Sequence, residues 1–280
     1  MTRLAERLPE PVLRVARPLV HPLFVARVRV RDGLPRLRER LLWGGPRRER
    51  FLLRALGRHY ESVRRRQWVL ADSAPHFFDQ RHNAYDLLAG VGHPFGFTRG
   101  YLAGELVRPG DRVLDIGCGD GFFARRFLAA RGADVDAIDI EPDAIRHAQV
   151  HNADPQVRYV LGDAVAEPFP ARRYDVVVWD GALGHFPRET TEAMLAKIVA
   201  VLGEDGVFAG SESLGHEGHD HLQFFPSTDA LVEVLRPSFR YVDVRTLEYT
   251  LPDGRVRREA YWRCAQEPAR LDGVAWTRAA

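Results

Sequence analysis

Hydrophobic and polar positions follow two different periods along the chain. Short apolar runs predict five buried strands, and apolar residues at helical spacing predict four helices between and after them. Strands that alternate with helices build a parallel sheet with helices on both faces. The pattern therefore predicts an α/β protein with a doubly wound sheet. The strands are expected near 112–116, 135–140, 157–161, 174–179 and 206–211, and the helices near 121–130, 142–152, 188–202 and 227–235.

Several other segments complete the prediction for the sheet. Two alternating runs at 239–249 and 255–265, joined across 252–254, predict an antiparallel hairpin. The sequence also predicts a loop at 90–100 and a glycine-containing turn at 202–206, before the fifth strand. The fold class is thus α/β, mostly parallel, with a C-terminal antiparallel hairpin.

The first quarter of the chain has a different character. Residues 1–46 contain six prolines, which limit helix length, whereas apolar positions at helical spacing between 47 and 70 indicate an amphipathic helix. Residues 1–70 carry 18 arginines against six acidic residues, hence +12, so the other 210 residues carry −10 of the total of +2. We expect an Arg-rich helical N-terminal extension or lid over 1–84 and a core domain over 85–280.

This basic extension allows three interpretations of its partner. Arginines bind the phosphates of nucleic acids, and they also bind an anionic membrane surface or an anionic acceptor. Alternatively, the extension forms an oligomer contact or a lid whose charge is solvated or paired with the acidic core. Its aromatic residues have helix-packing spacing and do not interleave as in an RNA-binding module, which disfavours nucleic acid as the partner.

Composition and length narrow the class of protein. A chain of 280 residues with 45% hydrophobic content can bury a large core, and no run of 18 apolar residues predicts a membrane span. The N-terminus shows no unbroken apolar stretch of the signal-peptide kind, so we expect a cytoplasmic protein. Cys118 and Cys264 are the only cysteines, which argues against a disulfide framework and a cysteine-based zinc site.

The strongest chemical signal is a strand that leads into three glycines at alternate positions, Gly117, Gly119 and Gly121. Glycine permits positive φ and lets backbone N–H groups approach a ligand. The spacing differs from the G-x-G-x-x-G of dinucleotide-binding proteins. Asp115 precedes the first glycine by two residues. Asp139 ends the second strand, where a carboxylate is placed to accept hydrogen bonds from a ribose diol.

Two more elements follow in order, 159–164 at the third strand and 174–186 at the fourth. Together with the glycine turn they resemble the class I S-adenosylmethionine (SAM)-dependent methyltransferases over about residues 85–265. The resemblance implies a Rossmann-like sheet, methyltransferase activity and SAM as the cofactor. In that family Asp163 would accept the adenine amino group. The resemblance assigns SAM binding to Asp115, Gly117, Cys118, Gly119, Gly121, Asp139, Ile140, Asp163, Ala164 and Asp180.

Acceptor-side residues should come from segments beyond the carboxyl ends of the strands. His185, after the fourth strand, is the leading candidate for a general base because imidazole titrates near neutrality. The alternative is that His185 only positions its loop or contacts SAM. His82 and Tyr85, in an aromatic and polar segment, and His219, in the polar loop 211–221, complete the catalytic candidates. That loop also holds residues of metal-ligating type, but without a fixed spacing, so no metal is predicted.

A missing motif constrains the acceptor. Family members that methylate base amines or glutamine amides carry Asp, Asn or Ser followed by Pro-Pro and an aromatic residue, where this chain has Asp180-Gly-Ala-Leu183. We therefore predict O- or N-methylation of a small-molecule acceptor in a secondary-metabolite, sugar or lipid pathway. Two alternatives stay open: an RNA methyltransferase that uses the basic extension, and a SAM-binding protein without transferase activity.

Overall fold

The computed structural model describes residues 51–52, 55–56, 59, 95–215, 221–250, 256–271 and 276–278. The chain divides into two units, Met1–Glu61 and Ser62–Ala280, and the account below concerns the second unit. The predicted N-terminal extension and its boundary between residues 84 and 85 fall almost wholly outside the described residues and stay predictions. No helix in the described part is long and apolar enough to cross a membrane.

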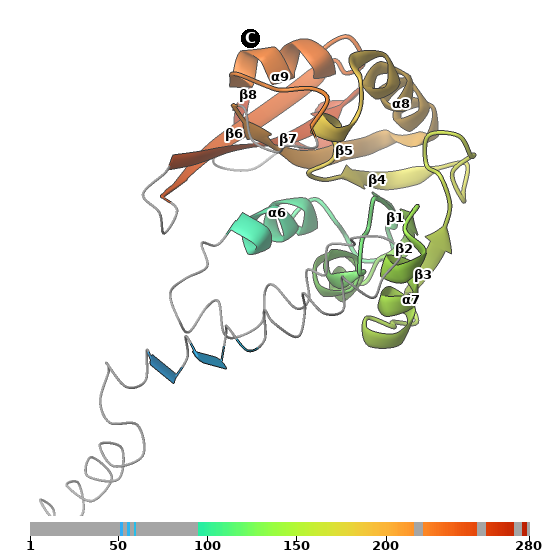
Figure 1. Cartoon of the computed structure of the whole chain (residues 1–280). Coiled ribbons are helices and arrows are strands. Elements are labelled where there is room, and N and C mark those ends of the chain that lie inside the picture. The colour runs from blue at the N-terminus through green and yellow to red at the C-terminus, as the bar shows by residue number, and fades with distance from the viewer. Residues whose placement is uncertain are drawn as a thin grey trace, which may run out of the picture. The chain divides into compact units, whose positions relative to one another are not determined.

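The described residues of the second unit form one sheet of eight strands in the order β3-β2-β1-β4-β5-β7-β6-β8 (Figure 1). Strands β1 to β5 run parallel, whereas β7 runs antiparallel between β5 and β6. This confirms the predicted mostly parallel sheet with a C-terminal antiparallel hairpin. The strands are β1 (Arg112–Ile116), β2 (Asp134–Asp139), β3 (Val157–Leu161), β4 (Tyr174–Trp179), β5 (Leu202–Leu214), β6 (Tyr241–Thr250), β7 (Val256–Ala265) and β8 (Thr277–Arg278).

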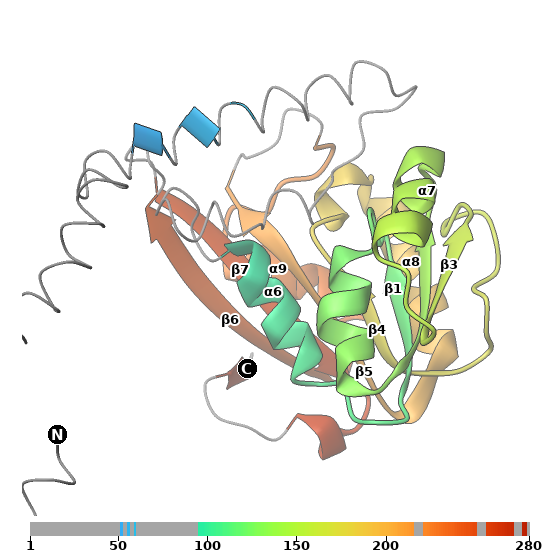
Figure 2. The same ribbon diagram turned by 90° about the horizontal axis from the view of Figure 1, so that it is seen from below.

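Helices cover both faces of the sheet (Figure 2). The helix α6, the short helical segments that follow β1 and the helix α7 lie on one face, and α8 and α9 lie on the other. Successive strand residues point to opposite faces, so Leu114 packs in the core under α8 and α9 while Val113 packs in the core under α7. The helices are α6 (Phe95–Gly104), α7 (Pro142–His151), α8 (Arg188–Val201) and α9 (Thr228–Leu235), with shorter helical turns at Ala124–Leu128, Ala129–Arg131, Leu183–His185 and Pro268–Arg270.

The loop predicted at 90–100 is wrong for its described part, because residues 95–100 begin α6. The rings of Phe97 and Tyr101 pack edge-to-face on Phe127, with centroid distances of 6.3 and 5.1 Å. This packing outweighs the low helix propensity of the glycines in the segment.

Two further elements are built differently from the prediction. The helix expected at 121–130 is π-helical over Ala124–Leu128 and continues as a 3-10 turn over Ala129–Arg131. The turn expected at 202–206 lies inside β5, where pairing moves from Tyr174–Leu202 to Val176–Val207. The extra residues of β5 form a bulge, so the glycines there mark an irregular strand instead of a strand boundary.

Candidate active site

Backbone conformation explains the glycines that follow β1. Gly117 and Gly121 have φ values of 71° and 77°, which residues with a side chain rarely adopt. A Cβ added to Gly121 would lie 2.5 Å from the Tyr159 hydroxyl oxygen, whereas one added to Gly117 would meet nothing within 4 Å. Glycine is therefore required at Gly121 for both conformation and space, and the backbone beside Gly117 is left open.

Asp139, at the end of β2, is tied to this glycine turn. Its Oδ2 accepts a hydrogen bond from the backbone N–H of Gly119 and its Oδ1 one from Glu141, each at 2.8 Å. Burial raises the pKa of the Asp139 carboxyl, and these two hydrogen bonds oppose the rise. Each carboxylate oxygen has a further lone pair, so the side chain can hold the turn and still accept hydrogen bonds from a ligand.

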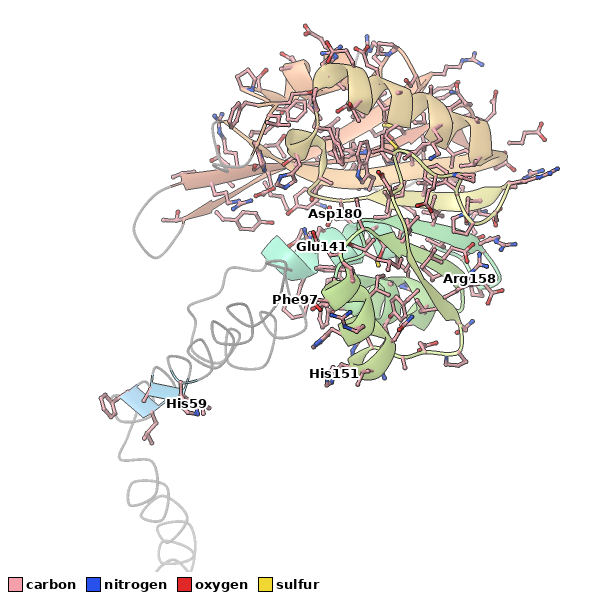
Figure 3. All side chains as sticks on the ribbon, turned by 45° about the vertical axis from the view of Figure 1, so that its right-hand side comes forward. His59, Phe97, Glu141, His151, Arg158 and Asp180 are labelled. Carbon is pink, nitrogen blue, oxygen red and sulfur yellow. The ribbon has the colours of Figure 1, made fainter. Side chains whose placement is uncertain are left out.

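A pocket of about 470 Å³ lies at the carboxyl ends of β1, β2 and β4. Asp180, after β4, and Glu141, after β2, stand at the same edge of the sheet (Figure 3). Ligands of open α/β sheets bind at this edge. Seven of the predicted SAM-binding residues line the pocket: Asp115, Gly117, Cys118, Gly119, Asp139, Ile140 and Asp180. The other lining residues are Arg99, Gly100, Ala103, Phe123, Phe127, Leu128, Glu141, Ala144, Val178, Gly181, Ala182 and His185.

Asp115 is the most deeply buried acid of this pocket, with 4% of its side chain exposed. Burial raises the pKa of the Asp115 carboxyl, the neighbouring carboxylates of Asp180 and Asp139 add to the rise, and Arg99 opposes it; together these effects bring the pKa to about 7. The Asp115 Oδ2 atom has no hydrogen-bond partner among the described residues. A buried oxygen of this kind is costly unless a ligand satisfies it.

Arg99, from α6, is a pocket residue that the sequence analysis missed. Its Nε atom lies 3.0 Å from Oδ2 of Asp180, and its guanidinium stacks 4.2 Å from the centre of the Phe123 ring. Asp180 also accepts a hydrogen bond of 2.5 Å from Oγ of Ser211. Arg99 fell in the predicted loop, and its role depends on packing between α6 and the segment after β1, which leaves no motif.

Two predicted SAM-binding residues, Asp163 and Ala164, do not line the pocket, and neither does Gly121. The Oδ1 atom of Asp163 accepts hydrogen bonds from the backbone N–H groups of Val165 and Ala166, at 2.8 and 3.3 Å. Asp163 therefore shapes the loop after β3, and its assignment to the adenine amino group stays a prediction.

On the predicted acceptor side, His185 lines the pocket from the helical turn that follows β4. The other catalytic candidates, His82, Tyr85 and His219, lie outside the described residues. A further buried acid, Glu259 of β7, is 1% exposed and was not singled out from the sequence, and it is not among the residues that line the pocket. Burial raises the pKa of the Glu259 carboxyl to about 7 against the opposing effect of Arg257. Among the described residues, no three side chains of metal-ligating type are grouped to hold a metal ion.

Comparisons with known proteins agree with this geometry. A family model described as a methyltransferase domain matches residues 113–206. An uncharacterized methyltransferase of Mycobacterium tuberculosis is 36% identical over 97 residues, which are 35% of this chain and 48% of the relative. A ubiquinone biosynthesis O-methyltransferase of Xanthomonas campestris is 33% identical over 90 residues, 31% of this chain and 37% of the relative. The chain thus spans about half or less of the length of the curated relatives it matches.

Among solved structures, the cyclopropane synthase MmaA2 from Mycobacterium tuberculosis is similar in fold. The two structures align with a TM-score of 0.50 and 15% sequence identity. The alignment covers 60% of this chain and 84% of the synthase chain. At this identity the likeness shows the fold alone. Residues 113–206 therefore form a methyltransferase domain of the class I SAM-dependent type.

Proposed function

We propose that this chain transfers the methyl group of SAM to a small-molecule acceptor, by O- or N-methylation. The observation that carries the proposal is the convergence of Asp115, Asp139 and Asp180 on one pocket beside an open glycine turn. With Glu141, four carboxylates line this pocket, which suits a donor with a positively charged sulfonium and ammonium group.

The residues of the pocket fit each part of SAM. Asp139 keeps lone pairs for a ribose diol, and the unpartnered Oδ2 of buried Asp115 can pair with an ammonium group. Arg99 is the one arginine or lysine that lines the pocket among the described residues, so it is our candidate for the carboxylate of the donor. Ile140, which is 60% exposed at the pocket edge, offers apolar surface for an aromatic base.

Bound SAM would supply a methyl group on a positively charged sulfur. When the methyl group is transferred, the sulfur becomes the neutral thioether of the product. The chain then has to hold the acceptor in line with that methyl group and remove a proton from it. His185 is placed for the proton transfer, since it lines the pocket on the β4 side next to Ala182. The hydrogen bonds from the N–H groups of Gly119 and Glu141 to Asp139 hold the donor side in place during this step.

A small-molecule acceptor is supported over a nucleic-acid acceptor by two points. The segment after β4, Asp180-Gly-Ala-Leu183, lacks the proline pair that accompanies methylation of base amines. One of the curated relatives is an O-methyltransferase of ubiquinone biosynthesis. The alternatives are RNA methylation through the basic N-terminal extension and SAM binding without transfer.

One experiment separates these three functions. Purified full-length chain is incubated with SAM labelled in the methyl group, with a small-metabolite extract in one reaction and total RNA in another. We expect label in the metabolite fraction. Label in RNA alone would refute the small-molecule acceptor. SAM binding without transfer to either fraction would favour a non-catalytic protein.

A further inference from the structure

The turn after β4 is held at a single glycine. The N–H of Gly184 donates to Oε2 of Glu212 at 2.9 Å, and its carbonyl oxygen accepts from the N–H groups of residues 222–223 at 2.7 and 3.0 Å. The N–H of His185 donates to the carbonyl of Ala182 at 3.1 Å. Both peptide planes beside Gly184 are therefore fixed, and with them the Cα atom from which the His185 side chain projects.

Glu212 connects this turn to the sheet. Its side chain is 3% exposed, and its second carboxylate oxygen accepts from the N–H of Ser213 at 3.0 Å. A buried carboxylate is tolerated when its oxygens accept hydrogen bonds, and both oxygens of Glu212 accept from backbone. The strand β5 pairs with β4 as far as Ala209 and with β7 as far as Leu214, with Glu212 opposite Ala260 of β7. Glu212 thus ties the His185 turn to an interior strand.

The side chain of His221 contacts the imidazole ring of His185 in the same turn. Its ring packs edge-to-face on that of His185, with centroids 4.6 Å apart and planes at 78°. A Cβ added to Gly184 would collide with Nδ1 of His221. Glycine at position 184 leaves room for the His221 ring beside His185, and a Cβ there would force this ring to move.

We propose that Glu212 and His221 are positioning residues for His185. Glu212 fixes the backbone that carries His185, and His221 restricts the orientation of its imidazole ring. The inference rests on the proposed function, because that function gives His185 its task as a proton acceptor. A base must be held within about 0.5 Å and 10–20° of its working geometry, and these contacts provide that restraint.

The first test is a double-mutant cycle that combines substitutions of Glu212 and His185. Glu212→Gln keeps the size of the side chain but removes one of its two hydrogen-bond acceptors. The activity is measured with the metabolite fraction that accepts label from SAM. We expect kcat to fall about tenfold in Glu212→Gln, and the affinity for S-adenosylhomocysteine (SAH) to change less than about twofold. In a His185→Ala background the same change should lower kcat less than about twofold, because the two residues act as a unit. Glu233→Gln, at an exposed position of α9, is the matched control.

The second test is a size exchange between Gly184 and His221. Gly184→Ala alone should lower the melting temperature through its collision with the His221 ring. Adding His221→Ala removes that collision and should restore the melting temperature, whereas kcat should stay at the level of His221→Ala alone. Full recovery of kcat in the double variant would show that His221 fills space and does not position His185.

A third readout does not depend on transfer. If the wild-type chain transfers no methyl group, the proposed function fails, and NMR of the histidine Cε1–H groups still tests the restraint on His185. Its signal is identified by its loss in His185→Ala. We expect Glu212→Gln to shift and broaden that signal and Glu233→Gln to leave it unchanged. An unchanged signal in folded Glu212→Gln, or an equal loss of kcat with and without His185, would overturn the inference.

Discussion

One half of the sheet consists of β1, β2 and β4, and the other half consists of β5, β7 and β6. The carboxylates of Asp139 in the first half and Glu259 in the second are held differently. In the first half, backbone N–H groups of the glycine turn and of Glu141 hold Asp139. In the second half, Glu259 pairs with the side chain of Arg257. Nearby, the hydroxyl oxygens of Tyr249 and Tyr261 lie 2.8 Å apart.

Strand register places these side chains on one face of the sheet. Asp115, Val178 and Ala209 are neighbours across β1, β4 and β5, so they share a face. Ser213 lies four residues beyond Ala209 on that face, opposite Glu259. A site whose side chains are held by backbone N–H groups requires particular residue types at fixed spacing, so it can be recognised as a motif in the sequence. A site held by side-chain pairs can be built in many ways and leaves none.

The largest expected effect separates turnover from donor binding. His185→Ala removes the proposed proton acceptor, so kcat should fall about 100-fold or more, as is typical for loss of a general base. SAH affinity, measured by calorimetry, should change less than about threefold, because the donor contacts assigned to Asp115 and Asp139 remain. An equal loss in SAH affinity and in kcat would remove His185 from the role of base.

The second prediction compares the partly buried carboxylate of Asp139 with the buried carboxylate of Glu259. Asp139→Ala should weaken SAH binding by about 30- to 100-fold, the size expected when hydrogen bonds to a charged group are lost. Glu259→Gln, at a buried acid of the hairpin half, should change SAH affinity less than about twofold. Asp134→Ala, at the exposed start of the same strand β2, controls for the loss of an acid. Similar losses in Asp139→Ala and Glu259→Gln would break the distinction between the two halves.

This distinction also explains what the sequence could predict. The positions of the parallel strands, the hairpin and the pocket-lining positions of Gly117, Asp139 and His185 follow from period and motif, because backbone geometry restricts those residues. Arg99 and Glu259 could not be predicted, since the first depends on how α6 packs and the second on side-chain pairing with Arg257 within β7. The turn expected at 202–206 became a bulge because β4 and β5 pair on either side of it.

The third prediction uses two glycines with the same backbone constraint. Gly117 and Gly110 have φ values of 71° and 84°, and an added Cβ would meet nothing within 4 Å at either position. Alanine at each should therefore cost a similar stability, about 1 kcal/mol, measured by urea unfolding. Only Gly117→Ala should weaken SAH binding, by about tenfold, because only Gly117 borders the pocket. Equal SAH affinity in the two variants would place the donor elsewhere.

The smallest expected effect is a pH dependence that originates in Asp115. Its pKa of about 7 in the folded chain exceeds the ordinary value of 3.8, so between these values the folded state binds a proton that the unfolded state has lost. Folding stability contributed by Asp115 therefore falls as pH rises from about 4 to about 7. SAH affinity should rise several-fold over about pH 6 to 8, because the ionised carboxylate pairs with the ligand ammonium.

Asp115→Asn should flatten both curves. Thermal unfolding and calorimetry at pH 5 and at pH 8 supply the measurement, and the variant should gain most in relative stability at the higher pH. Glu259, whose pKa is also raised to about 7, adds its own fall in stability over the same interval. If the pH dependence of SAH binding persisted in Asp115→Asn, another group of the pocket would carry it.

The central claim, that the pocket between the glycine turn and His185 holds the methyl donor, is tested most directly by a crystal structure of the chain with SAH. We predict SAH in the pocket of about 470 Å³, with its ribose hydroxyls on Asp139 and its sulfur facing the side that His185 lines. SAH bound away from these residues, or no SAH in crystals grown at saturating concentration, would contradict the account.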